Sequence, residues 1–153
     1  MIQTSRTFSS YFIAVITTLL TLAAGIQGHA LQEVLVDAKV LERARVKYGA
    51  DAVEHINALQ SLIKNDDSKS DAEKLEKVNQ FFNKYTFIDD IDHWGKKDYW
   101  ATPIEFLATQ GGDCEDFSLA KYFTLKALGI PESKLYLTYV KAIKLNQAHM
   151  VLT

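Results

Sequence analysis

The segment from Cys114 to Leu128 has the pattern of a helix but is apolar on nearly every side. Beyond its first turn, the charged residues are Lys121 and Lys126 alone. A helix without a polar face has to be covered by other elements all round. A glycine pair precedes the segment and the tripeptide Gly-Ile-Pro ends it. The sequence therefore predicts a buried central helix around which the rest of a domain packs.

Amphipathic helices are predicted before this segment. We expect them at residues 32–47, 50–64, 70–85 and 102–109. Ser70 with Glu73, and Thr102 with Glu105, have the spacing of a capping box, in which a hydroxyl and a carboxylate satisfy the first N–H groups of a helix. Four helices thus precede the central one.

Between the last two of these helices, residues 86–101 are irregular and rich in aromatic side chains. We expect Tyr99 and Trp100 to pack into the core. Trp94 stands beside a glycine and is the candidate for an exposed interface residue, because aromatic residues often anchor interfaces.

β-Branched and aromatic residues dominate the end of the chain. They predict strands at 135–143 and 148–153, joined by a turn. With the helices, these strands indicate an α+β fold in which the central helix packs on an antiparallel sheet. The length of 153 residues suits one domain, and a net charge of −2 without a basic stripe argues against nucleic acid as a partner.

Residues 1–30 differ from the rest of the chain. They contain Arg6 but no acidic residue, then an apolar stretch, then Gly28 and Ala30 at the spacing of a cleavage site. This layout is typical of a secretory signal peptide. A membrane anchor is the alternative, but the apolar stretch is short and interrupted by threonines. We therefore expect an exported protein whose folded domain covers residues 31–153.

Cys114 is the single cysteine of this chain, so it cannot form an internal disulfide. Free cysteines are more often buried and inert than reactive. Cys114 stands, however, where the central helix begins. Backbone N–H groups at a helix N-terminus favour the thiolate and can bind a developing oxyanion.

A cysteine nucleophile needs a base, which is normally a histidine. The chain offers His29, His55, His93 and His149. His149 begins a strand that follows the central helix, which makes it the candidate, although a structural histidine is the competing interpretation.

A close resemblance to a known family is carried by two segments, DYWATPIEFLATQGGDCEDFSLAKYFTLKALGIP (98–131) and AHMVL (148–152). They resemble the bacterial transglutaminase-like cysteine proteinases, periplasmic enzymes of the adhesin-releasing LapG type with a papain- and transglutaminase-like fold. The resemblance implies that Cys114 is the nucleophile and His149 its base. It also implies a large surface adhesin as the substrate, cut near its N-terminus at a pair of alanines so that a biofilm disperses. The implied regulator is the periplasmic domain of an inner-membrane receptor for cyclic di-GMP.

Three carboxylates surround the cysteine: Asp113, Glu115 and Asp116. Acidic residues at a helix N-terminus stabilise its dipole, but three beside a nucleophile would oppose its ionisation. A bound cation explains them better, and carboxylate oxygens suit Ca²⁺. The resemblance likewise implies calcium at these acidic residues.

The resemblance also implies a third catalytic residue, an aspartate on the strand after the histidine strand. No residue corresponds to it, because the sequence ends four residues after His149. We therefore expect a fragment or a truncated copy. Two other hypotheses stay open: acyl transfer to an amine, and a non-catalytic module that binds the receptor or the adhesin.

Overall fold

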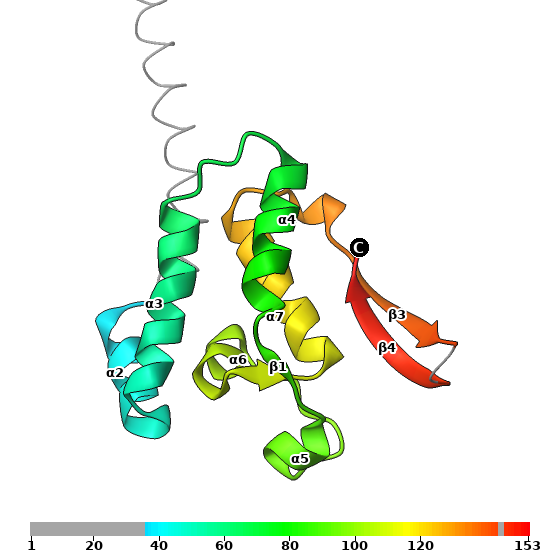
Figure 1. The fold of residues 1–153 in the computed structure, drawn as a ribbon, viewed down its shortest axis with the longest axis horizontal. Coiled ribbons are helices and arrows are strands. Elements are labelled where there is room, and N and C mark those ends of the chain that lie inside the picture. The colour runs from blue at the N-terminus through cyan, green and yellow to red at the C-terminus, as the bar shows by residue number, and fades with distance from the viewer. Residues whose placement is uncertain (1–35, 144–145) are drawn as a thin grey trace, which may run out of the picture.

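The computed structural model describes residues 36–143 and 146–153 (Figure 1). The predicted signal peptide and the beginning of the first predicted helix lie outside these residues. The helices are α2 (Ala38–Tyr48), α3 (Ala50–Lys64), α4 (Asp71–Phe82), α5 (Asp90–Trp94), α6 (Pro103–Thr109), α7 (Cys114–Ala127) and the short 3₁₀ helix η1 (Glu132–Lys134). The strands are β1 (Thr86–Phe87), β2 (Gly111–Gly112), β3 (Leu137–Ala142) and β4 (Gln147–Leu152). The described part of the chain is thus α+β, as predicted.

The helix caps fix where α4 and α6 begin. The Ser70 hydroxyl accepts a hydrogen bond from the Glu73 N–H at 3.2 Å, but the Glu73 carboxylate accepts from the Lys69 N–H instead of the Ser70 N–H. At α6 the capping box is complete, because Thr102 and Glu105 each accept from the other's N–H. Both predicted starts are therefore confirmed.

The core lies between α3, α4, α6 and α7. Its largest fully buried apolar side chains come from all four helices: Ile56, Val78, Phe82, Phe106, Leu107 and Leu125. Helix α7 contacts α4, α6 and β4 on different sides, which confirms the prediction of a central helix (Figure 1). Phe123 is the exception, because it is 42% exposed.

Residues 86–101 contain more structure than the sequence indicates. Strand β1 runs parallel to β2, with Thr86 opposite Gly111. A side chain on Gly111 would overlap the Thr86 carbonyl oxygen, so glycine lets the two strands meet. The short helix α5 follows. The prediction for Trp100 is wrong: it lies outside any helix or strand, in the connection from α5 to α6, and it is 45% exposed.

The strands β3 and β4 form an antiparallel hairpin that stands to one side of the helices (Figure 1). Met150, opposite Tyr139, is its deeply buried side chain, at 4% exposure. Tyr139 and Ile143 remain 62% and 86% exposed. None of the helices in residues 36–143 and 146–153 has the length and apolarity that crossing a bilayer requires.

Candidate active site

Cys114 is the first residue of α7, the helix at the centre of the core. Its side chain is partly buried. The thiol donates to Glu115 Oε2 at 2.7 Å and accepts from the Met150 N–H at 3.3 Å. The nucleophile candidate is therefore held between the first turn of α7 and strand β4.

The first turn of α7 is capped by Asp113. Its Oδ1 accepts from the N–H groups of Glu115 at 3.2 Å and Asp116 at 3.4 Å. These two N–H groups are therefore engaged, which leaves the Cys114 N–H as the oxyanion donor that the turn itself can offer.

The electrostatic setting of Cys114 disfavours the thiolate. Burial, followed by the hydrogen bond to the Glu115 carboxylate, raises the pKa of the Cys114 thiol to about 11. The Glu115 pKa is lowered, because hydrogen bonds, the first of them from Cys114, outweigh the effect of burial. In this arrangement the sulfur is a neutral thiol beside a carboxylate, and a nearby cation would favour its ionisation.

Three carboxylates meet beside this turn: Asp90, Asp113 and Asp116 each place an oxygen within 4.8 Å of the others. Asp116 is fully buried and accepts from the Ala101 N–H at 2.7 Å and the Asp113 N–H at 3.4 Å. Burial, with repulsion from neighbouring carboxylates, raises the pKa of Asp113 to about 7 and that of Asp116 to about 6. Within the described residues, none of the three carboxylates forms an ion pair.

This cluster fits a calcium ion. Calcium binds oxygen ligands at about 2.3–2.6 Å, so two ligands of one ion are up to about 5 Å apart. The three carboxylates satisfy this limit, and Asp90 Oδ1 is buried with no hydrogen-bond partner in the described structure. An all-oxygen donor set with an unpartnered buried oxygen is the chemistry that such an ion requires.

The predicted metal ligands are only partly brought together. Asp113 and Asp116 lie in the cluster, whereas the Glu115 carboxylate bonds the Cys114 thiol and the Tyr139 hydroxyl, the latter at 3.1 Å. The third carboxylate of the cluster comes from Asp90 and not from Glu115. Sequence reasoning missed Asp90 because it stands 23 residues before Asp113 in a segment with no periodic pattern.

Gly112 keeps the cluster close to the chain. A side chain at this position would overlap the Asp116 carboxylate. The two glycines before α7 are therefore required for different reasons. Gly111 leaves room for β1, and Gly112 leaves room for the Asp116 carboxylate.

His149 lies on β4, opposite Val140 of β3. Together with Cys114 it lines two grooves of about 600 and 610 Å³. The first, the α4 groove, is lined among others by Leu75, Asn79, Asn83, Phe117, Lys121 and Leu152. The second, the acidic groove, is lined among others by Asp89, Asp90, Lys97, Asp113, Glu115 and Gln147. The two candidate catalytic residues thus share the place where the grooves adjoin.

The aromatic segment packs beside this site. Trp94 is partly buried, with its ring 4.3 Å from that of His93 and 4.8 Å from that of Tyr99, centre to centre. The expectation of an exposed Trp94 is therefore wrong, because its neighbours in the segment fold over it.

Solved structures of a relative are similar to this chain in fold and sequence. Legionella pneumophila LapG in its calcium-bound form is 40% identical, with a TM-score of 0.64, and the match covers 76% of this chain and 65% of that one. Another structure of Legionella pneumophila LapG and its EGTA-treated form are each 41% identical with the same TM-score, over 77% of this chain and 65% and 63% of theirs. The chain thus spans slightly less than two thirds of these relatives. A comparison with curated proteins gives no significant match.

The family comparison covers most of the chain. Residues 48–153 match the bacterial transglutaminase-like cysteine proteinases. This range includes the central helix, the acidic cluster and the hairpin with His149. The chain belongs to the bacterial transglutaminase-like cysteine proteinase family.

Proposed function

We propose that this protein is an exported, calcium-dependent cysteine endopeptidase with Cys114 as nucleophile and His149 as general base. The observation that carries the proposal is the position of Cys114. It begins a buried helix and shares two grooves with the single histidine of β4. A thiol, a base and a helix N-terminus are the parts that acyl transfer from a peptide requires.

In the proposed reaction His149 takes the proton of the Cys114 thiol, and the sulfur attacks the carbonyl carbon of a peptide bond. The negative oxygen of the tetrahedral intermediate accepts a hydrogen bond from the Cys114 N–H. When the C–N bond breaks, the imidazolium returns the proton to the leaving amine and a thioester remains. Water then hydrolyses the thioester, with His149 again as base.

Asp90, Asp113 and Asp116 would hold the calcium ion. When bound, the ion supplies positive charge that offsets the carboxylates around Cys114. The calcium-bound form of the LapG relative supports a calcium site in this chain, and the geometry of the cluster supports these three ligands. Without a cation the three carboxylates repel one another, so we expect the first turn of α7 to be held less firmly in its present position.

The proposed substrate is a large surface adhesin, cut near its N-terminus in the periplasm, so that the cell detaches from a biofilm. The proposed regulator is the periplasmic domain of an inner-membrane cyclic di-GMP receptor that sequesters the protease. Similarity to LapG structures and the predicted signal peptide support these proposals.

The test is cleavage of a purified N-terminal adhesin fragment by this chain, with calcium and with a chelator added. We expect cleavage that calcium restores after chelation and that Cys114→Ala abolishes. Mass spectrometry of the products with and without an added primary amine separates hydrolysis from acyl transfer.

A binding assay on the same fragment addresses the non-catalytic hypothesis. Tight binding without any cleavage by the wild-type chain would show a binding module. Cleavage that persists in Cys114→Ala would contradict the proposed nucleophile.

A further inference from the structure

The α4 groove contains a lysine on the same helix face as the candidate nucleophile. Cys114, Ser118 and Lys121 follow one another at spacings of four and three residues, and all three line this groove. A helix rises about 1.5 Å per residue, so Lys121 lies roughly 10 Å along α7 from Cys114. A substrate that occupies the groove beside Cys114 therefore passes Lys121.

In the described part of the chain, the ammonium of Lys121 interacts with neutral groups. Its Nζ donates to Asn83 Oδ1 at 2.9 Å and lies 5.9 Å from the centre of the Phe117 ring. The other lysine of the groove, Lys134 of η1, instead donates to Asp71 Oδ2 at 2.8 Å. Within the described residues Lys121 makes no ion pair.

Partial burial without an opposite charge has a cost. Desolvation lowers the pKa of the Lys121 ammonium. An ammonium has three donors, of which one is used by Asn83. A carboxylate arriving in the groove would therefore gain a charge-assisted hydrogen bond to a partly desolvated cation.

The two grooves differ in charge on either side of Cys114. Among the described residues, the acidic groove is lined by Asp89, Asp90, Asp113 and Glu115 against one lysine, Lys97. In the α4 groove the one acidic side chain, Asp71, is paired with Lys134. Even with calcium on Asp90 and Asp113, the acidic groove keeps Asp89 and Glu115. An acidic group of a bound chain is therefore favoured in the α4 groove over the acidic groove.

We propose that Lys121 forms a specificity subsite that binds an aspartate or glutamate side chain of the polypeptide substrate. An extended chain advances about 3.3 Å per residue. The carboxylate would therefore lie about three residues from the bond that Cys114 attacks. This inference rests on the proposed function and names a feature of its substrate.

The probes are short peptides, acetylated and amidated, so that a side chain supplies their sole carboxylate. Each has a central Ala-Ala pair and one glutamate, or a matched glutamine, at successive positions on either side. Binding to the Cys114→Ala chain with calcium is measured by fluorescence anisotropy, and kcat/KM is measured with the wild-type cysteine.

We expect the glutamate peptide to bind about tenfold more tightly than its glutamine match at one position, about three residues from the centre on one side only. This preference should vanish in Lys121→Met and persist in Lys121→Arg. In Lys121→Glu a lysine peptide should be preferred instead. Lys84→Met, an exposed lysine outside the groove, controls for net charge and should change nothing.

Equal binding of all glutamate and glutamine pairs would overturn the subsite, as would a preference that survives Lys121→Met or the failure of every peptide to bind. The two proposals fail differently. Selective binding without Cys114-dependent cleavage contradicts the endopeptidase alone. Cleavage without a glutamate preference contradicts the subsite alone.

Discussion

The candidate site is shared by two parts of the molecule that differ in burial. One is the helical unit, formed by α2 to α7, and the other is the β3–β4 hairpin. The helical unit carries Cys114 and buries side chains such as Phe106 completely. The hairpin carries His149 and buries only Met150 and Leu135 nearby, while Ile143 is 86% exposed. A two-stranded hairpin is marginally stable by itself, so contacts with α7 must hold it. The proposed nucleophile therefore begins the central helix of the core, whereas the proposed base lies on a hairpin that depends on its contacts with α7.

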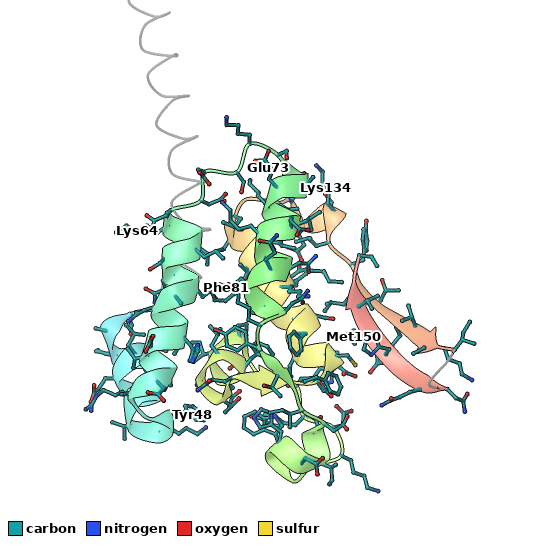
Figure 2. All side chains as sticks on the ribbon, in the orientation of Figure 1. Tyr48, Lys64, Glu73, Phe81, Lys134 and Met150 are labelled. Carbon is teal, nitrogen blue, oxygen red and sulfur yellow. The ribbon has the colours of Figure 1, made fainter. Side chains whose placement is uncertain are left out.

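Those docking contacts centre on Met150. Met150 lies on β4 (Figure 2). Its N–H donates to the Cys114 sulfur at 3.3 Å, and its carbonyl oxygen accepts from the Ser118 hydroxyl at 3.3 Å. Since His149 immediately precedes Met150, these contacts also hold the backbone of His149 in place. Changes in the helical unit should thus affect folding, and changes at Met150 should affect activity more than folding.

The largest effect on stability should come from Phe106→Ala. Phe106 is fully buried and its ring packs against those of Phe82, Tyr85 and Phe117. Loss of this ring leaves a cavity and should lower the free energy of unfolding by about 3–5 kcal/mol. Urea titration followed by circular dichroism measures it. A loss below about 1 kcal/mol would mean that this ring is not part of the core.

Met150→Ala should weaken the hairpin docking. We expect a loss of about 2 kcal/mol in unfolding free energy, at the low end for a buried methionine because the hairpin can shift. The fall in kcat/KM on the adhesin fragment should exceed what the loss of folded protein explains. Ile143→Ala, on the exposed part of the hairpin, is the matched control and should alter neither quantity. Equal effects of the two variants would contradict docking through Met150.

Ser118→Ala removes one of the two hydrogen bonds on Met150. The carbonyl left without its partner should cost about 1 kcal/mol. Hydrogen exchange of the β4 amides should accelerate while that of α4 is unchanged. Acceleration spread evenly over both elements would show that the hairpin and the helices open as one unit.

The smallest effect concerns an ion pair inside the helical unit. The Lys77 ammonium lies 2.8 Å from Asp66 Oδ1, and together with Ser68 it lowers the Asp66 pKa, although burial acts in the opposite direction. A lowered pKa in the folded state contributes stability above the unfolded value of about 3.9, and this is lost as the pH falls through the folded value. Lys77→Met should therefore cost below about 1 kcal/mol at pH 7, and the difference should shrink in acid. Thermal melts at several pH values measure it; a difference that grows in acid would contradict this assignment.

The parts of the fold that sequence predicts well are those whose cause is local. The apolar pattern of α7 and the cap at Thr102 lie within a few residues of the structures they specify. The parallel pair β1–β2 and the approach of Asp90 to Asp113 depend on residues about 25 apart, and no local pattern encodes them. The same limit explains why the sequence predicts Glu115 to be a metal ligand. One of its two side-chain partners, Tyr139, lies on the hairpin, far from it in the sequence.

The central claim is that the hairpin supplies the base for a nucleophile held in the core. Its direct test is the rate at which a peptide p-nitroanilide acylates Cys114, followed by intact-mass spectrometry in the presence of calcium. We predict an acyl adduct on Cys114, absent in Cys114→Ala and formed at least about 10²-fold more slowly in His149→Ala. Acylation of His149→Ala at the wild-type rate would contradict the account.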